Sequence, residues 1–205
     1  MVGAVLAGGR SQRMGYDKVS LRLQGRPLVE WAVSAVRQVL DEVWIIGGSP
    51  GLAEASGARY APDLVVGVGP LGGVYSALCA IKADLLTVAC DMPFIQPALL
   101  RGLLSHAPDC DAVVPVNGGY YEPLLAVYRR SCLPALEEAL FAGQRRLAGI
   151  YGQVNLCTVP EDRWRGWDPE GLSFVNINTP DDLARVHDRL RGDTDWRAPA
   201  ASSSA

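Results

Sequence analysis

The chain has 205 residues, of which 49% are hydrophobic and 20% are charged, and its formal net charge is −3. This balance is ordinary for a globular protein, and the length suits one sizeable core. The weak negative charge argues against a general basic surface for nucleic acid. No apolar run reaches the roughly 18 residues that a membrane span needs. We therefore expect a protein that binds neither nucleic acid nor a membrane.

The cysteines and histidines give no sign of a metal site. The five cysteines are scattered without a Cys-x-x-Cys pair, and the two histidines lie far apart. This spacing argues against zinc and against a disulfide framework. The chain starts at Met1 with an apolar segment, without the basic region of a signal peptide. We therefore expect reduced thiols and a cytoplasmic location.

Short apolar runs that end near glycine or a polar turn alternate with helical patterns in the first half of the chain. In chain order these are a strand at Val2–Leu6, a helix at 28–39, a strand at Val43–Ile46, a helix at 72–82 and a strand at Leu85–Cys90. Alternation of this kind is typical of right-handed crossovers and a sheet covered on both faces. The expected fold is α/β, a three-layer α/β/α sandwich around a mainly parallel, Rossmann-like sheet.

The second half of the chain is more mixed. Two apolar runs, Ala112–Val116 and Leu124–Tyr128, flank the turn sequence Asn117-Gly118-Gly119. This arrangement predicts an antiparallel pair that adds to the sheet. Helical patterns follow at Ser131–Phe141 and Pro180–Leu190.

The end of the chain differs in composition from the rest. From Arg191 it becomes polar and small, and it closes with Ala201-Ser202-Ser203-Ser204-Ala205. Such a segment buries little apolar surface. We expect a single domain over residues 1–190 and a disordered tail over 191–205.

The clearest candidate for a ligand site follows the first strand. It reads Leu6-Ala7-Gly8-Gly9-Arg10-Ser11-Gln12-Arg13-Met14-Gly15-Tyr16-Asp17-Lys18. Two glycines at a strand end let backbone amides approach a ligand, and the three basic side chains can neutralise phosphate oxygens. The segment is not a Walker A loop, because Lys18 is followed by Val19. It predicts a phosphate-binding loop, and a solvated turn with incidental surface cations is the alternative.

A carboxylate ends the third strand, in Cys90-Asp91-Met92-Pro93. In open α/β sheets, ligands bind outside the carboxyl ends of the strands. A single carboxylate there suits Mg²⁺, which takes one or two protein carboxylates and completes its shell with phosphate and water. The alternative is an aspartate in a turn before proline. On the first interpretation, Gly8 and Asp91 converge on a triphosphate from two strand ends.

A formal dinucleotide-binding fingerprint lies between these two motifs, in Gly67-Val68-Gly69-Pro70-Leu71-Gly72-Gly73. Pro70 interrupts the loop, and Leu64–Val66 before it is too short for a secure strand. The match to NAD or FAD binding is therefore weak. A tight turn that leads into a helix is the plain alternative.

Two later segments carry polar residues that local structure explains only in part. Thr179 and Pro180 suit the N-cap and first position of a helix, where the two following aspartates also favour the helix dipole. Asn176 and Asn178 remain. Alternating on a strand, they could present amides to a ring, and the alternative is that they are ordinary loop asparagines. Arg145 and Arg146 precede a predicted short helix, and alone they indicate only a solvated basic face.

Taken in order, these motifs resemble those of the molybdopterin guanylyltransferases over roughly residues 3–190. The family signature is Leu-Ala-Gly-Gly, then Arg-Met-Gly, then Asp-Lys, whereas related cytidylyltransferases more often have Leu-Ala-Ala-Gly. The resemblance implies a GT-A-like nucleotidyltransferase sheet. It implies transfer of GMP from GTP to the terminal phosphate of molybdopterin or Mo-molybdopterin, which forms molybdopterin guanine dinucleotide and releases pyrophosphate.

The resemblance also implies roles for individual residues. The catalytic residues would be Lys18, Arg13 and Asp91, with Asp91 as the ligand of Mg²⁺, or of Mn²⁺ in its place. The substrate-binding positions would be Leu6, Ala7, Gly8, Gly9, Gly15, Lys18, Gly47, Asp63, Gly69, Gly73, Asp91, Arg145, Arg146, Asn176 and Asn178. The arginine pair would hold the pterin's phosphate and the two asparagines its ring, while Glu122 would orient substrate. Near Gly47 the family often has an asparagine, which this chain lacks.

The implied reaction needs no strong base, because a phosphate monoester is already anionic. It needs alignment of two anions and neutralisation of the leaving pyrophosphate, which Lys18, Arg13 and a metal on Asp91 would supply. Transient contacts with other cofactor-biosynthesis proteins and molybdoenzyme chaperones are also implied. Two alternatives stay open: another base or acceptor, as in the cytidylyl, sugar-1-phosphate or phospholactate branches, and a nucleotide- or pterin-binding carrier without turnover.

Overall fold

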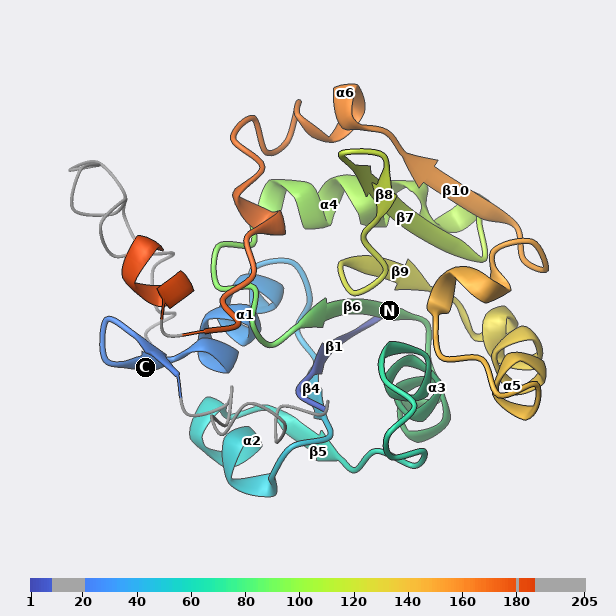
Figure 1. Cartoon of the computed structure of the whole chain (residues 1–205), viewed down its shortest axis with the longest axis horizontal. Coiled ribbons are helices and arrows are strands. Elements are labelled where there is room, and N and C mark those ends of the chain that lie inside the picture. Colours follow the sequence, from blue (N-terminus) through green and yellow to red (C-terminus); the bar gives the residue numbers. More distant parts are fainter. Residues whose placement is uncertain (9–20, 180, 187–205) are drawn as a thin grey trace.

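The framework of the molecule is a mixed, mainly parallel sheet. The computed structural model describes residues 1–8, 21–179 and 181–186. Eight strands of these segments form one sheet in the order β10-β7-β9-β6-β1-β4-β5, with β8 paired to β7. They are β1 (Val2–Leu6), β4 (Val43–Ile46), β5 (Arg59–Ala61), β6 (Leu85–Ala89), β7 (Ala112–Asn117), β8 (Tyr120–Tyr121), β9 (Ala126–Tyr128) and β10 (Leu156–Val159). Figure 1 shows the strands between two layers of helices.

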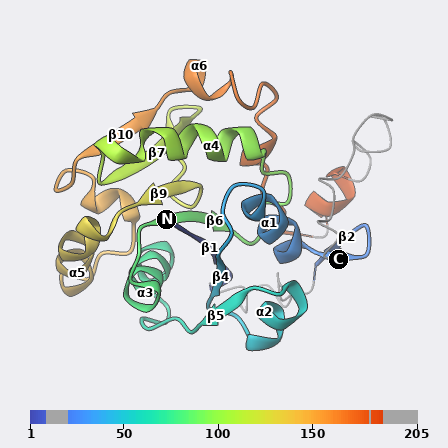
Figure 2. The ribbon, with the colours of Figure 1, turned by 180° about the vertical axis from the view of Figure 1, so that it is seen from behind.

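Helices cover both faces of this sheet. The helices with assigned bounds are α1 (Leu28–Arg37), α2 (Pro50–Ser56), α3 (Pro70–Ile81), α4 (Pro97–His106), α5 (Leu133–Phe141) and α6 (Glu161–Trp164). α1, α2 and α4 pack on one face, and α3 and α5 pack on the other (Figure 2). The predicted three-layer α/β/α sandwich is therefore confirmed. Within the described segments, every helix is too short or too polar to span a bilayer.

Short 3₁₀ turns and one small hairpin complete the described structure. The turns are η3 (Ala107–Asp109), η4 (Arg130–Cys132), η5 (Leu147–Ile150) and η6 (Leu172–Phe174). The hairpin pairs β2 (Arg22–Leu23) with β3 (Arg26–Pro27) and leads into α1. Residues 181–186 are also helical, which agrees with the first part of the helix expected at 180–190. The expected tail over 191–205 lies outside the described residues.

β1 lies in the middle of the sheet because both of its edges are paired. It runs parallel to β4, where Leu6 faces Ile46, and parallel to β6, where Leu6 faces Ala89. All five of its residues are buried, which explains why the sequence shows a continuous apolar run there. Alternate side chains enter different cores: Val5 packs with α1 and α4, and Leu6 packs with α3.

The antiparallel pair expected in the second half is present, with a different connection. β9 is antiparallel to both β7 and β6. The turn at Gly118 and Gly119, which have φ of 56° and 83°, instead joins β7 to β8. Left-handed φ values at two successive glycines are what a tight hairpin turn requires. The predicted strand at Leu124–Tyr128 therefore begins only at Ala126.

A disulfide corrects the expectation that all thiols are reduced. Cys110, which precedes β7, is bonded to Cys157 in β10, with Cα atoms 5.8 Å apart. The two cysteines are 47 residues apart in sequence, and spacing along the chain gives no hint of their proximity. They meet because β10 is added parallel to the outer edge of β7, where Cys157 lies opposite Val113.

Candidate active site

The carboxyl ends of β1 and β6 lie side by side at one edge of the sheet. The Cys90 N–H donates a hydrogen bond to the Leu6 carbonyl at 3.2 Å, so the register continues past the last paired residues. The glycine segment that begins at Gly8 and the loop that carries Asp91 therefore leave the sheet from neighbouring points. The expected convergence of these two strand ends is confirmed for their described parts.

Gly8, Gly47 and Asp63 follow three neighbouring strands, β1, β4 and β5, and pack against one another. A Cβ on Gly8 would collide with the Asp63 carboxylate. A Cβ on Gly47 would lie 2.7 Å from Asp63 Oδ2 and 2.9 Å from the Gly8 Cα. Gly47 also has a φ of 75°, which favours glycine. Glycine at both positions is thus what lets a carboxylate lie directly against the backbone at this strand end.

In the part of the chain that the structure describes, one oxygen of the Asp63 carboxylate is buried without a partner. Its Oδ1 is buried and has no hydrogen-bond partner among the described residues, and burial raises the pKa of this carboxyl group. A buried acceptor without a partner costs free energy, so it points to a ligand donor. Ser76 fixes the neighbouring loop by accepting from the Leu64 N–H at 2.9 Å and donating to the Gly72 carbonyl. This role of Ser76 could not be predicted from sequence motifs.

Gly69 and Gly73 lie at the start of α3, next to the same strand ends. Gly69 precedes the helix with a φ of 77°, and α3 begins at Pro70, two residues before the predicted start. A Cβ on Gly73 would approach the Leu6 side chain at 3.7 Å. Residues 64–66 are not a strand, so the formal dinucleotide fingerprint lacks the strand that must precede it. The interpretation as a turn into a helix is the one that fits.

Asp91 lies beside the segment that contains the two candidate asparagines. The Ile177 N–H donates to the Asp91 backbone carbonyl at 2.9 Å, which places Asn176 and Asn178 at the same edge of the sheet. The expectation that these asparagines alternate on a strand is wrong, because residues 175–178 form no strand. Their backbone is instead held at one point by Asp91 and farther along by the next helix.

That helix begins as the sequence predicts. The Thr179 hydroxyl accepts from the Asp182 N–H at 3.1 Å, and the Asp182 carboxylate accepts from the Asn178 and Thr179 N–H groups at 3.1 and 3.0 Å. This reciprocal pattern is a capping box with aspartate as its acidic member. Hydrogen bonds lower the pKa of Asp182, and the largest effect comes from the side chain of Thr179.

Glu122 follows β8, which lies on the side of β6 opposite to β1. Its N–H donates to the Pro115 carbonyl at 2.9 Å, and its Oε1 accepts from the Asn117 side-chain amide at 3.4 Å. Burial raises the pKa of Glu122, and the Asn117 hydrogen bond opposes this shift. The contribution of Asn117 was missed from the sequence, where it counted only as a turn residue.

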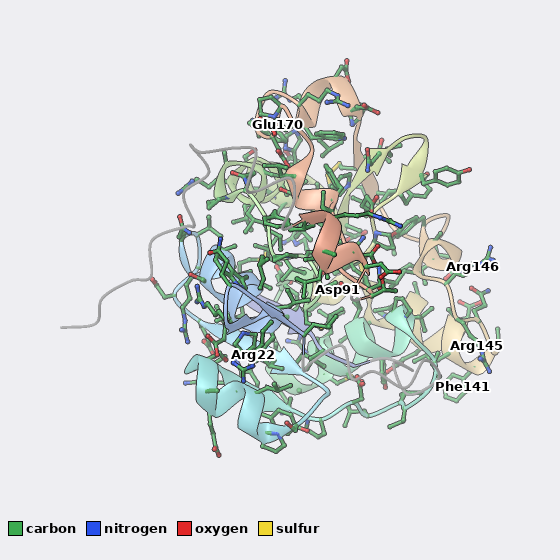
Figure 3. The ribbon with its side chains drawn as sticks, turned by 60° about the vertical axis from the view of Figure 1, so that its left-hand side comes forward. Arg22, Asp91, Phe141, Arg145, Arg146 and Glu170 are labelled. Atoms are coloured by element: carbon green, nitrogen blue, oxygen red, sulfur yellow. A yellow bond between two sulfur atoms is a disulfide. The ribbon has the colours of Figure 1, made fainter. Side chains whose placement is uncertain are left out.

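The remaining predicted site residues are not brought to Asp91 by the described structure. Arg145 and Arg146 are exposed and precede η5, which confirms the short helix expected after them. Figure 3 shows both arginines at the margin of the molecule, well away from Asp91. Gly9, Arg13, Gly15 and Lys18 lie outside the described residues.

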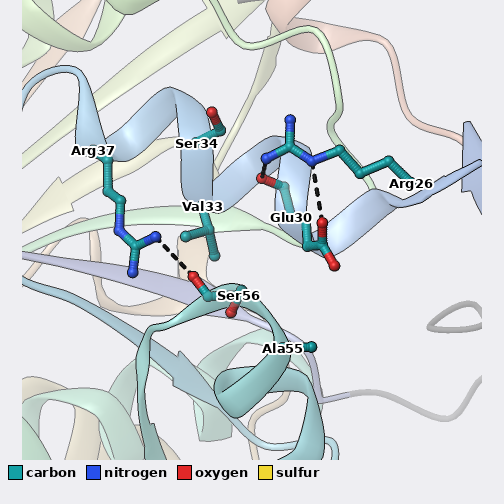
Figure 4. A pocket seen from close by; sticks show the side chains of 7 residues that line it. All are labelled: Arg26, Glu30, Val33, Ser34, Arg37, Ala55 and Ser56. Atoms are coloured by element: carbon teal, nitrogen blue, oxygen red, sulfur yellow. Dashed lines mark hydrogen bonds and ion pairs between the residues drawn. The ribbon is translucent and has the colours of Figure 1, made fainter. Parts of the chain in front are cut away.

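One pocket of the described structure lies elsewhere, between α1 and α2 (Figure 4). Its two basic side chains are already engaged. Arg26 pairs with Glu30 at 3.2 Å, and Arg37 donates to the Ser56 carbonyl at 2.7 Å. None of the predicted site residues lines this pocket, so we assign the candidate site to the strand ends.

Comparison with known proteins identifies the family of the chain. Residues 3–156 match the family described as MobA-like NTP transferase domain. A relative from Pelotomaculum thermopropionicum, named a probable molybdenum cofactor guanylyltransferase, is 39% identical over 185 residues, which are 90% of each chain. A relative from Desulfosudis oleivorans, named molybdenum cofactor guanylyltransferase, is 32% identical over 93% of this chain and 96% of its own.

Solved structures give the same result. Molybdopterin-guanine dinucleotide biosynthesis protein A from Archaeoglobus fulgidus is 33% identical and superposes with a TM-score of 0.79, covering 94% of this chain and 100% of its own. A cytidylyltransferase from Thermus thermophilus, 19% identical with a TM-score of 0.66, shares the fold, and the alignment covers 93% of this chain and 98% of its own. The chain therefore belongs to the MobA-like NTP transferases, and within them to the molybdenum cofactor guanylyltransferases.

Proposed function

We propose that this protein transfers GMP from GTP to the terminal phosphate of molybdopterin or Mo-molybdopterin. The products are molybdopterin guanine dinucleotide and pyrophosphate. The family and the consistent names of its relatives support this assignment. The observation in the molecule that carries it is the meeting of the carboxyl ends of β1, β4, β5 and β6 at Gly8, Gly47, Asp63 and Asp91. In an open α/β sheet, such an edge is where a nucleotide binds.

GTP would lie over the ends of β1, β4 and β5. The backbone at Leu6, Ala7 and Gly8 can approach a ligand closely because Gly8 carries no side chain. The Asp63 carboxylate, whose buried Oδ1 has no partner among the described residues, would accept hydrogen bonds from the N1–H and 2-amino groups of guanine. These two donors distinguish guanine from adenine and cytosine. Gly47, Gly69 and Gly73 would border the base and sugar.

The phosphates would extend from there toward Asp91. Lys18 and Arg13, with the backbone of Gly9 and Gly15, would hold them, and this part of the proposal rests on the sequence motif. The acceptor phosphate attacks the α-phosphorus, the new P–O bond forms, and the bond to the β-phosphate oxygen breaks. The electron pair and negative charge leave with pyrophosphate. The task of the two basic residues is to align the two anions and to neutralise the leaving group.

A divalent cation fits the carboxylate at Asp91. In the described part of the chain no group of three or more metal-binding side chains occurs, so a dedicated protein cage is not available there. A lone carboxylate at a strand end instead matches Mg²⁺, which keeps substrate phosphates and waters in its shell. When bound, the cation acts as a Lewis acid on the phosphate oxygens. A distant relative of the same fold, 19% identical, has been solved in complex with manganese, which agrees with Mn²⁺ as a substitute.

Molybdopterin would bind on the other side of Asp91. Asn176 and Asn178 flank the residue whose N–H contacts the Asp91 carbonyl, and their amides would face the pterin. Arg145 and Arg146 would hold the pterin's phosphate only if the acceptor or the loop moves, because they lie away from Asp91 (Figure 3). Contacts with other cofactor-biosynthesis proteins and molybdoenzyme chaperones, and a cytoplasmic location, stay predictions.

The proposal is tested by supplying the full-length protein with Mg²⁺, molybdopterin and each of the four NTPs in turn. Pyrophosphate release and the dinucleotide product are measured. We expect turnover with GTP alone. Turnover with another base, or only with another phosphorylated acceptor, would favour a different branch of the fold. Nucleotide binding without pyrophosphate release would indicate a carrier.

A further inference from the structure

Asp91 divides the edge of the sheet into two halves. The nucleotide half comprises the carboxyl ends of β1, β4 and β5 and the start of α3. The acceptor half comprises β9, the β7–β8 hairpin and residues 174–178. The sheet order places β6, which ends just before Asp91, between β1 and β9. Under the proposed function, GTP occupies the first half and the pterin occupies the second.

Each half contains one carboxyl group with the same unusual environment. Among the described carboxyl groups, a raised pKa is found at Asp63 in the nucleotide half and at Glu122 in the acceptor half, and burial is the first cause for both. Within the described residues, the Glu122 carboxylate accepts one hydrogen bond, from the Asn117 amide at 3.4 Å. That distance is long for an N–H···O bond, so most of the acceptor capacity of this carboxylate remains for another donor.

The hairpin fixes the direction of Glu122. Tyr120 lies opposite Asn117, and the Glu122 N–H continues this ladder to the Pro115 carbonyl. Residues two apart on a strand share a face, so Glu122 and Tyr120 lie on the same side as Asn117. Tyr121 lies on the opposite side, where its ring packs edge-on to Tyr151. Tyr120 is 79% exposed and thus offers an aromatic surface beside the carboxylate.

Residues 174–177 link the surroundings of this hairpin to Asp91 by contacts at their two ends. At one end, the Phe174 ring packs 4.6 Å from the Trp164 ring, and the Trp164 indole N–H donates to the Val116 carbonyl at 2.8 Å. At the other end, the Ile177 N–H contacts the Asp91 carbonyl. In the sheet order, β9 alone separates β7 from β6, and neighbouring strands lie about 4.7–4.9 Å apart. β7 is parallel to β6, because β9 is antiparallel to both, so the hairpin that carries Glu122 and the loop that carries Asp91 leave the sheet at the same edge.

The chemistry of the two substrates matches this pair of carboxylates. Guanine and pterin share a 2-amino-4-oxopyrimidine edge, in which a ring N–H and an exocyclic amino group point the same way. A carboxylate can accept from both donors at once with its two oxygens. We infer that Glu122 recognises the amino-oxo edge of the pterin in the acceptor half, as the counterpart of Asp63 on guanine. This inference rests on the proposed function and adds the residue that selects the acceptor ring.

The test uses the full-length protein and the Glu122→Gln variant. Glutamine has nearly the same shape and keeps one acceptor, but its amide opposes the second ring donor. With saturating GTP and Mg²⁺, we expect the KM for molybdopterin to rise roughly 10- to 100-fold, as for a lost charge-assisted pair, while the KM for GTP stays unchanged. The KM for molybdopterin should recover in part in Glu122→Asp.

Binding of small probes supplies a readout that does not require turnover. Pterin and lumazine, which has an oxo group in place of the 2-amino group, are titrated against the protein by fluorescence. The parent protein should prefer pterin, and Glu122→Gln should lose that preference. Glu138→Gln is the matched control: this carboxylate is exposed on α5 and does not belong to the acceptor half, so its replacement should change neither value.

The outcomes separate the inference from the proposed function. If Glu122→Gln folds normally by circular dichroism and keeps both the parent's KM for molybdopterin and its pterin preference, the inference is wrong while the guanylyltransferase assignment stands. If the parent protein releases no pyrophosphate from GTP and molybdopterin, the proposed function fails regardless of Glu122. In the complementary variant, Asp63→Asn, the preference for GTP over ITP should fall and pterin binding should be retained.

Discussion

The nucleotide half and the acceptor half of the sheet edge are stabilised in different ways. In the nucleotide half, the parallel strands β1 and β4 are largely buried, and the absence of side chains at Gly8 and Gly47 lets their backbones lie against Asp63. In the acceptor half, β8 and β9 are short and antiparallel to β7, and side-chain hydrogen bonds hold the loops: Asn117 to Glu122, and Trp164 to Val116. The Cys110–Cys157 disulfide joins the start of β7 to β10.

This difference follows from what each half has to bind. A nucleotide site that relies on the backbone needs close approach and fixed strand ends, which buried parallel strands provide. A site that reads a ring through side chains needs carboxylate and amide groups at a hairpin, where residues can vary without disturbing the central strands. The fold can therefore keep one nucleotide-binding half and change its acceptor, which fits the range of transferases that share it.

The largest effect is expected at the boundary between the halves. Replacing Asp91 by asparagine keeps the size of the side chain but removes the charge that would hold the divalent cation. We expect nucleotide transfer to fall by about a thousandfold or more, the order seen when a principal electrostatic group is removed. Single-turnover release of pyrophosphate measures it.

Two observations would show whether this loss has the proposed cause. Asp91→Asn should remain folded by circular dichroism and should keep the hydrogen bond from the Ile177 N–H, because that bond goes to the backbone carbonyl of residue 91. GTP binding without divalent cation should also be similar in the two proteins. Normal turnover by the variant would remove the assigned role of Asp91.

The acceptor half should depend on its disulfide. The Cys110–Cys157 bond closes a loop across 47 residues. A loop of this length predicts a loss of at most about 4 kcal/mol in the free energy of unfolding when the bond is absent. Denaturant unfolding of the Cys110→Ala/Cys157→Ala double variant, compared with the parent with and without reductant, measures this loss.

The double variant also provides the control. Reductant should destabilise the parent and leave the double variant unchanged. GTP binding, which belongs to the nucleotide half, should be retained by the folded variant. If reductant has no effect on the parent, the bond contributes nothing to the stability of this half and the contrast between the halves is weaker than we describe.

The sequence predicted the nucleotide half better than the acceptor half, for a physical reason. The central strands at residues 2–6, 43–46 and 85–89 are buried on both faces, so each is a continuous apolar run with glycine or a polar turn after it. β10 is half-exposed, with a burial pattern that shows no clear alternation, and no prediction was made for it. The disulfide was missed with it, because Cys157 belongs to that strand.

The candidate site divides in the same way. Gly8, Gly47 and Asp63 could be named from the family resemblance, but their mutual packing could not, because it depends on the register of three strands. Asn176 and Asn178 were placed at the right edge for a wrong reason. Their Asn-x-Asn spacing suggested a strand, whereas a single hydrogen bond from Ile177 to Asp91 fixes the segment.

A single methyl group should disturb the nucleotide half. In Gly8→Ala, the new Cβ would collide with the Asp63 carboxylate, so either the backbone or Asp63 must move. Overpacking of this kind costs about 1–3 kcal/mol. Because the collision occurs where the base would bind, we expect the Kd for GTP to rise by roughly 10- to 100-fold, measured by calorimetry.

Gly51 supplies the matched control for this substitution. It lies within α2, and a Cβ there would meet no atom within 4 Å. Gly51→Ala should leave GTP binding unchanged and stabilise the fold slightly, by up to about 1 kcal/mol, because alanine favours a helix. Equal affinities for GTP in Gly8→Ala and Gly51→Ala would mean that the strand end at Gly8 does not contact the nucleotide.

The smallest effect concerns the pH dependence of stability, and it compares the two carboxylates directly. Burial raises the pKa of Asp63 and of Glu122 above their ordinary values of 3.8 and 4.5. The folded state therefore binds protons more tightly at these groups than the unfolded state does. The stability that these two carboxyl groups contribute to the fold is fully present below their ordinary pKa. It is lost as the pH rises through their raised pKa in the folded state. Both groups thus destabilise the fold at neutral pH, where a ligand donor would compensate.

Asp63→Asn and Glu122→Gln should each remove this loss of stability. The resulting gain in the free energy of unfolding should be less than about 1 kcal/mol for each variant, because solvent screens half-buried groups. Urea unfolding between pH 4 and 7 should show a smaller decrease in stability for each variant than for the parent. Saturating GTP should offset the penalty at Asp63 and leave the one at Glu122. The contrary result is a stability that rises steadily over this pH range in the parent and in both variants. It would show that burial does not destabilise either carboxylate, and that neither needs a ligand donor to compensate.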